Sequence, residues 1–161
     1  IQRPATWDTY EREFKNVLRG MPDEGIHRGI FGDIDMELHR AWVERVCSEC
    51  SIIPSLPLWS EKRSDLLSEL ISTGFKVVIV AVDKHFLDET WVGREIDDAF
   101  VSDIDMHSTD VDICGEAGEY HTFVYDGPIF ARKVVFEKGP VRSDGDHFFL
   151  DILSPSIQGE T

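Results

Sequence analysis

The residues best suited to chemistry lie in one segment, residues 114–130, which reads CGEAGEYHTFVYDGPIF. Gly115 and Gly118 are three residues apart, and both can adopt positive φ angles and let a ligand approach the backbone closely. Glu116 and Glu119 bring two carboxylates to the same turn, where they repel each other unless a cation is near. This combination suits a magnesium-bound phosphate or an amine nucleophile, and the alternative is a solvated acidic turn.

A second candidate is Asp33 in the sequence FGDID, where an apolar run ends and a helical pattern begins. Ligands of open parallel sheets bind outside the carboxyl ends of the strands, so Asp33 is placed to hold Mg²⁺ or a ribose hydroxyl. The alternative is that Asp33 or Asp35 caps the helix that follows.

Two arginines are candidates for binding phosphate. Arg40 lies near the start of the helix predicted after Asp33, and its alternative role is an i,i+4 pair with Glu44. Arg94 follows Gly93, and a glycine before a predicted helix leaves free N–H groups for an anion. The alternative for Arg94 is a surface position at a helix start.

The cysteines favour packing over chemistry. Cys47 and Cys50 have CxxC spacing, but they lie within a helical pattern, and Cys114 is the only other cysteine. A structural zinc site needs four ligands, so we expect buried positions for the pair and predict no metal site. The odd number of cysteines fits a reducing compartment, and a cytoplasmic location is expected.

The composition restricts the class of protein. A chain of 161 residues that is 42% hydrophobic is typical of a folded globular domain with a core. Its net charge of −15 at pH 7 disfavours binding to nucleic acid or to an anionic membrane. No apolar run approaches the roughly 20 residues of a membrane span.

Alternating patterns predict how the candidate residues are positioned. Helices are predicted over residues 7–18, 36–50, 65–72 and 93–104, with Thr6 as the first N-cap, and strands over residues 29–34, 52–59 and 75–82. The last strand reads FKVVIVAV, which is typical of a strand buried on both faces. This order predicts an α/β fold with a parallel sheet and helices on both of its faces.

The pattern changes in the last third of the chain. Three strand patterns separated by turn signals follow Tyr120 and predict a small antiparallel β extension at the C-terminus. We therefore divide the chain into an α/β nucleotide-binding portion, residues 1–112, and a β-rich substrate-side region, residues 113–161.

Together these segments resemble the diphthine–ammonia ligase family, which belongs to the N-type ATP pyrophosphatases of the PP-loop superfamily. GEAGEYHTFVYDGPIF is similar to the family's GE-(N/G)-GEY-x-TFV-x-D-x-P-x-F block, and GIFGDIDMELHRAWVERVC is similar to its G-D-I…R…E-x-VC block. The resemblance extends from about Trp7 to Lys138. It implies that the parallel sheet is Rossmann-like, of the adenine nucleotide alpha hydrolase type.

The resemblance also implies an activity. The enzyme would be an ATP-dependent amide ligase that uses ATP and Mg²⁺ to adenylate a carboxylate, releases pyrophosphate, and lets ammonia displace AMP. Its substrate would be the diphthine residue of elongation factor 2 in an archaeal or eukaryotic source, and another carboxylate in a bacterium. A homodimer is a further option.

The resemblance assigns expected roles to residues of this sequence. The two expected catalytic residues are Glu116 and Glu119. The residues expected to contact the nucleotide are Asp33, Arg40 and Arg94. The residues expected on the substrate side are Gly115, Gly118, Thr122 and Arg45.

This sequence departs from the family pattern at two places, and both affect the function that is expected. The SGG-x-DS motif of the PP-loop does not occur in this chain, so either upstream residues carry it or the chain is a divergent member. Ala117 stands where the family has Asn or Gly, which is expected to retune the substrate. Two other functions stay open: a non-catalytic nucleotide- or protein-binding module that keeps the fold, and a metal-dependent phosphohydrolase that uses Asp33 and the glutamates.

Overall fold

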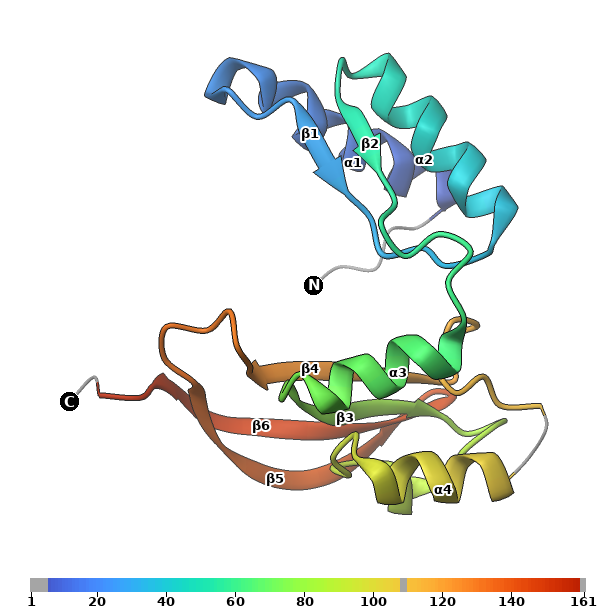
Figure 1. Ribbon diagram of the computed structural model, residues 1–161, viewed down its shortest axis with the longest axis vertical. Helices are drawn as coiled ribbons and strands as arrows, with labels where there is room; N and C mark the ends of the chain where they lie inside the picture. Colours follow the sequence, from blue (N-terminus) through green and yellow to red (C-terminus); the bar gives the residue numbers. More distant parts are fainter. Residues whose placement is uncertain (1–5, 108–109, 160–161) are drawn as a thin grey trace. The chain divides into compact units, whose positions relative to one another are not determined.

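The computed structural model describes residues 6–107 and 110–159. The chain divides into two compact units, one ending at Lys62 and the other beginning at Arg63 (Figure 1). Each unit has its own hydrophobic core. The change of sequence pattern at residue 113 falls inside the second unit, because strands before and after it pair in one sheet.

The first unit is a small parallel α/β arrangement. Its elements are α1 (Trp7–Gly20), the short 3-10 helix η1 (Pro22–Glu24), β1 (Arg28–Ile30), α2 (Glu37–Glu49) and β2 (Ile53–Ser55). β1 and β2 pair in parallel, with Arg28 opposite Ile53, and α2 connects them (Figure 1). The predicted order of helix, strand, helix and strand is confirmed. Among the residues that the structure describes, parallel pairing occurs only between these two strands.

The first helix begins where its cap was predicted. The side-chain oxygen of Thr6 accepts a hydrogen bond from the Thr9 N–H at 3.2 Å, which satisfies a donor that the helix itself cannot. The core of the unit consists of Leu18, Val43, Val46, Cys47, Cys50 and Ile52. Burial raises the pKa of the Cys47 thiol. The expected burial of the CxxC pair is therefore confirmed.

A carboxylate on α1 joins the two helices of this unit. Glu11 accepts two hydrogen bonds from the Arg45 guanidinium of α2, at 2.9 and 2.6 Å, and one from the Trp42 indole N–H at 2.8 Å. Lys15 pairs with Glu11 at 2.5 Å and with Glu49 at 2.6 Å. The Arg45 guanidinium, followed by Lys15 and Trp42, holds the pKa of Glu11 far below its ordinary range.

The second unit contains a four-stranded antiparallel sheet with the strand order β4-β3-β6-β5. The strands are β3 (Lys76–Asp83), β4 (Tyr120–Asp126), β5 (Val134–Asp144) and β6 (His147–Ile157), and the helices are α3 (Arg63–Ser72), η2 (Glu89–Trp91) and α4 (Asp98–His107). The predicted antiparallel strands of the C-terminal region are confirmed. In the described part of the chain, no helix has the length and apolar character needed to cross a membrane.

The prediction that residues 75–82 form a strand of a parallel sheet is wrong in direction. β3 pairs antiparallel with both β4 and β6. Three consecutive side chains of β3 are buried, Val77, Val78 and Ile79, as expected for a strand that is covered on both faces. Such burial occurs in any central strand, so it does not determine the direction in which the neighbouring strands run.

Residues 93–96 lie beside β3 and do not begin a helix. The Ile79 N–H donates to the Arg94 carbonyl at 2.9 Å, and the Gly93 N–H donates to the Ile79 carbonyl at 2.8 Å. The predicted helix therefore begins only at Asp98.

The strand β5 forms one edge of the sheet. Its pairing with β6 is irregular at two places, between Val135 and Glu137 and between Lys138 and Val141. Pro140 lies within the second irregular stretch and has no N–H to donate to the ladder. Both irregularities interrupt the regular pairing of the two strands.

We expect Glu11→Gln to lower the thermal stability of the first unit at pH 7, because a neutral amide attracts Arg45 and Lys15 less strongly. The folded-state pKa of Glu11 is lowered, so its contribution is present above the ordinary value of 4.5 and is lost as the pH falls below it. Thermal denaturation followed by circular dichroism should show a difference between wild type and variant that narrows at pH 3.

The matched control is Glu13→Gln, which removes the same charge from the same helix at a position where the side chain is 62% exposed. This control should change the melting midpoint little. Equal losses for the two variants, or a difference that stays constant with pH, would contradict the role assigned to Glu11.

Candidate functional site

Residues 112–119 form a tight loop that leads into β4. Gly115 and Gly118 have φ angles of 71° and 90°, in the left-handed region predicted for them. A Cβ added at Gly115 would lie 3.0 Å from the Tyr120 carbonyl oxygen and 3.1 Å from the Tyr120 ring. The loop therefore requires glycine at position 115 for its conformation and for the space available.

The carboxylate of Glu119 holds this loop from inside. Its side chain is buried, and the residue is only 2% exposed. One oxygen accepts the Asp112 N–H and the other accepts the Ala117 N–H, each at 3.0 Å. Since a buried carboxylate is stable only when donors surround it, these two bonds fix the path of the backbone on both sides of the turn.

The loop is completed by three residues that the sequence analysis did not select as site residues, namely Arg63, Asp112 and Tyr120. One oxygen of Asp112 accepts the Cys114 N–H at 2.7 Å, and the other lies 2.8 Å from Nε of Arg63 at the start of α3. The Tyr120 hydroxyl donates to the Ile113 carbonyl at 2.5 Å. Burial raises the pKa of Tyr120 well above its ordinary range, so the phenol stays neutral and keeps this bond.

Glu116 has different surroundings from Glu119. It lies between the two glycines and is half-buried, whereas Glu119 is buried. Thr122 is exposed on β4, where it pairs with Ile79 of β3. The two glutamates that the sequence analysis grouped therefore differ: Glu119 is buried and shapes the loop, and Glu116 is the less buried of the two acids.

Arg94 is positioned by the segment beside β3. Its guanidinium donates to Asp103 of α4 at 2.6 Å and lies 4.5 Å from the centre of the Trp91 ring. The Gly93 N–H already donates to Ile79, so it is not free to bind an anion. Any phosphate contact here depends on the guanidinium alone.

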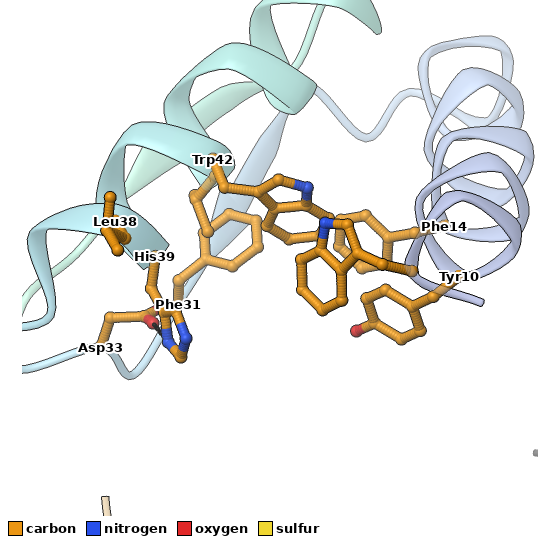
Figure 2. Close-up of a pocket in the computed structure, with 9 residues that line it drawn as sticks. Tyr10, Phe14, Phe31, Asp33, Leu38, His39 and Trp42 are labelled. Atoms are coloured by element: carbon orange, nitrogen blue, oxygen red, sulfur yellow. Dashed lines mark ion pairs between the residues drawn. The ribbon is translucent and has the colours of Figure 1, made fainter. Parts of the chain in front are cut away.

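In the first unit, Asp33 follows β1 at the carboxyl end of the two-stranded sheet. Its carboxylate lies 3.4 Å from Nδ1 of His39 on α2. Figure 2 shows both side chains at one side of a pocket with an aromatic wall. The cavity has a volume of about 620 Å³ and is lined by Trp7, Tyr10, Phe14, Phe31, Asp33, Leu38, His39, Trp42 and Val43.

The sequence analysis placed Asp33 at a strand end but missed the aromatic wall beside it. Trp7, Tyr10 and Phe14 recur at three- and four-residue intervals, which places them on one face of α1. In the sequence analysis, the apolar spacing of this segment serves only to predict the helix over residues 7–18. The exposure of Trp7 and Tyr10, 60% and 41%, shows that this face also reaches solvent.

Arg40 and Arg45 both contact acids of their own unit. Arg40 pairs with Glu44 at 2.8 Å, which is the alternative considered for it, and its guanidinium lies 4.9 Å from the centre of the Trp59 ring. Arg45 pairs with Glu11 at 2.6 Å and with another acid on α2. Arg45 therefore joins two helices, whereas Arg40 is held within one.

The structure groups the predicted site residues by unit. Asp33, Arg40 and Arg45 belong to the first unit. Arg94, Gly115, Glu116, Gly118, Glu119 and Thr122 belong to the second.

The described residues, 6–107 and 110–159, contain no group of three His, Cys, Asp or Glu side chains that could hold a metal ion. Mg²⁺ usually keeps several waters and takes one or two carboxylates together with substrate phosphates. Mg²⁺ that is bound in this way takes its remaining ligands from the nucleotide phosphates and from water.

Glu119→Gln should lower the free energy of unfolding by about 1–3 kcal/mol, because the amide nitrogen cannot accept the backbone N–H that faces it. Chemical denaturation measures the loss, and hydrogen exchange at the Asp112 and Ala117 amides should accelerate. Glu137→Gln, at an exposed acid of β5 in the same unit, is the control and should leave both measurements near wild type. An equally stable Glu119→Gln would contradict the structural role of this carboxylate.

The chain matches a family model described as the diphthamide synthase C-terminal domain over residues 62–153. It is 31% identical over 145 residues to a diphthine–ammonia ligase of Danio rerio, covering 86% of this chain and 54% of the relative. It is 32% identical over 112 residues to that of Bos taurus, covering 68% of this chain and 42% of the relative.

A third relative, the diphthine–ammonia ligase of Schizosaccharomyces pombe, is 28% identical over 160 residues, which cover 94% of this chain and 25% of the relative. The chain thus spans about half or less of the length of these relatives. The matched residues 62–153 include the glycine and glutamate loop and most of the second unit. The chain therefore belongs to the diphthamide synthase family and carries its C-terminal domain.

Proposed function

We propose that this chain is part of an ATP-dependent amide ligase that acts on a carboxylate of the diphthine type. The observation that carries the proposal is the loop of residues 112–119, in which a buried Glu119 holds the backbone and Glu116 is only half-buried. The loop lies within the matched family domain, and the relatives bear the name diphthine–ammonia ligase.

The reaction has two steps. The substrate carboxylate attacks the α-phosphorus of ATP, and the bond to the β-phosphate breaks, so that an acyl adenylate and pyrophosphate form. Ammonia then attacks the acyl carbon, the bond to AMP breaks, and the nitrogen loses a proton to leave the amide. Mg²⁺, when bound, neutralises phosphate charge during the first step.

Glu116 is proposed to receive the proton that the attacking nitrogen loses. A partly exposed carboxylate in a fixed loop can bind an ammonium ion and then accept a proton from the amine. Glu119 acts as a positioning residue, because its two oxygens already accept backbone N–H groups. Gly115, Gly118 and Thr122 are proposed to shape the space that the substrate enters.

The nucleotide is proposed to bind at the carboxyl end of β1 and β2. Asp33 is the acid at that position, and Arg40 lies on the first turns of α2. Arg40 and Arg94 are proposed to contact phosphate by exchanging their present acid partners for it, whereas Arg45 mainly stabilises the first unit. We place the reaction in the cytoplasm, where ATP is available.

The two parallel strands are proposed to belong to a larger Rossmann-like sheet in the complete ligase. Ile30 of β1 and Ile53 of β2 are 74% and 56% exposed, although both are large apolar residues in a sheet. Further strands and helices would bury these side chains, as in other parallel sheets.

The test is pyrophosphate release by the full-length protein that contains this chain, supplied with ATP, Mg²⁺, ammonia and a protein that bears diphthine. Pyrophosphate and amide should form in equal amounts. Glu116→Gln should lower kcat by about 10²- to 10⁴-fold, which is the range for loss of a general base. Glu137→Gln, at an exposed acid of β5 in the same unit, is the matched control and should keep full activity.

Two outcomes would count against the proposal. Full activity in Glu116→Gln would remove the proposed role of that carboxylate. ATP binding without any pyrophosphate release would instead indicate a nucleotide-binding module that does not catalyse ligation.

A further inference from the structure

The aromatic pocket of the first unit exposes large apolar side chains around one cavity. Trp7, Tyr10 and Leu38 line it and are 60%, 41% and 84% exposed. Large apolar side chains that gather at an open cavity are typical of a binding site. The cavity volume of about 620 Å³ lies within the usual range for small-molecule sites.

The rings of the pocket form a wall that suits another planar ring. The centroids of Trp7 and Tyr10 are 5.4 Å apart with an interplanar angle of 26°, and those of Tyr10 and Trp42 are 5.9 Å apart at 29°. Phe14 extends the wall, 5.3 Å from Trp42. Trp42 is held in place because its N–H donates to Glu11, so the wall does not need to be ordered when a ligand arrives.

The polar side chains of the pocket determine which hydrogen-bonding groups a bound ring carries on its edge. Figure 2 shows Asp33 and His39 on the α2 side, across from Tyr10 and Phe14 on α1. The Asp33 side chain is 21% exposed and, when ionised, can only accept hydrogen bonds. Asp33 also lies 3.4 Å from Nδ1 of His39, so a ring that stacks on the wall meets the remaining acceptor positions of the carboxylate. Such a ring must carry hydrogen-bond donors on its edge, and N–H groups of a heteroaromatic ring are donors of this kind.

We propose that this pocket binds a planar nitrogen heteroaromatic ring, stacked on Trp7 and Tyr10, with an N–H edge donated to Asp33. The proposal deepens the proposed function, because two of its reactants can supply such a ring: the adenine of ATP, or a ring carried by the amidated substrate. The same physical features would recognise either source.

The probes are adenosine and purine riboside, which lacks the exocyclic amino group, and binding to this chain is followed by calorimetry and tryptophan fluorescence. Adenosine should bind about tenfold more tightly, because only it donates an N–H to the carboxylate. Asp33→Asn should remove most of this preference. Asp23→Asn, at an exposed acid of η1 outside the pocket, is the matched control and should keep it.

The stacking wall is tested separately. Trp7→Leu should weaken adenosine binding about tenfold, the effect expected for loss of a stacking partner, while Trp7→Phe should retain most of the affinity. Since Trp7 is 60% exposed, neither change threatens the fold. Equal affinities for the two probes in wild type, or unchanged binding in Trp7→Leu, would overturn the proposal.

Competition with ATP distinguishes the two sources of the ring. Displacement of adenosine by ATP assigns the pocket to the base of the nucleotide, and adenosine that stays bound under saturating ATP assigns it to the substrate ring. If the full-length protein releases pyrophosphate but adenosine does not bind, only the pocket is refuted. If adenosine binds as expected and no pyrophosphate is released, only the ligase is refuted.

Discussion

The loop of residues 112–119 in the second unit depends on a buried carboxylate that has hydrogen-bond donors around it. Glu119 is almost fully buried, so the two backbone N–H groups whose hydrogen bonds it accepts replace the hydrogen bonds that water would otherwise donate to it. Those N–H groups belong to residues five positions apart, and the chain between them must turn sharply. Gly115 makes the turn sterically possible, and Glu116 is carried on it in a defined place.

In the first unit, too, a single carboxylate accepts hydrogen bonds from several elements and positions them. Glu11 gathers donors from Arg45, Lys15 and Trp42, so one carboxylate sets the distance between α1 and α2 and the orientation of an indole ring. The aromatic wall of the pocket therefore depends on an acid that is not part of its lining. In both units an acid organises a neighbouring surface.

The sequence was sufficient to predict the elements whose signal is local. The helix after Thr6, the buried cysteines and the positive φ angles of the loop glycines depend on neighbouring residues, and the structure has all three. The direction of β3 was not predictable from its own residues, because a continuous apolar run indicates burial and does not indicate the direction of the partner strand.

The difference between the two loop acids was not predictable either. Glu116 and Glu119 have the same side chain, and only the fold decides which one is buried. The pair of Arg63 with Asp112 joins distant parts of the chain and leaves no local pattern.

The irregular pairing of β5 has a consequence for the solubility of the sheet. An outer strand with a regular row of unpaired backbone groups can recruit a strand from another molecule and begin aggregation. In β5 the ladder is broken twice, and Pro140 removes one donor from the row. Lysine and glutamate side chains flank these breaks. The outer edge of the sheet is thereby a poor template for strand addition, which allows the long β5–β6 hairpin to stay exposed without promoting aggregation.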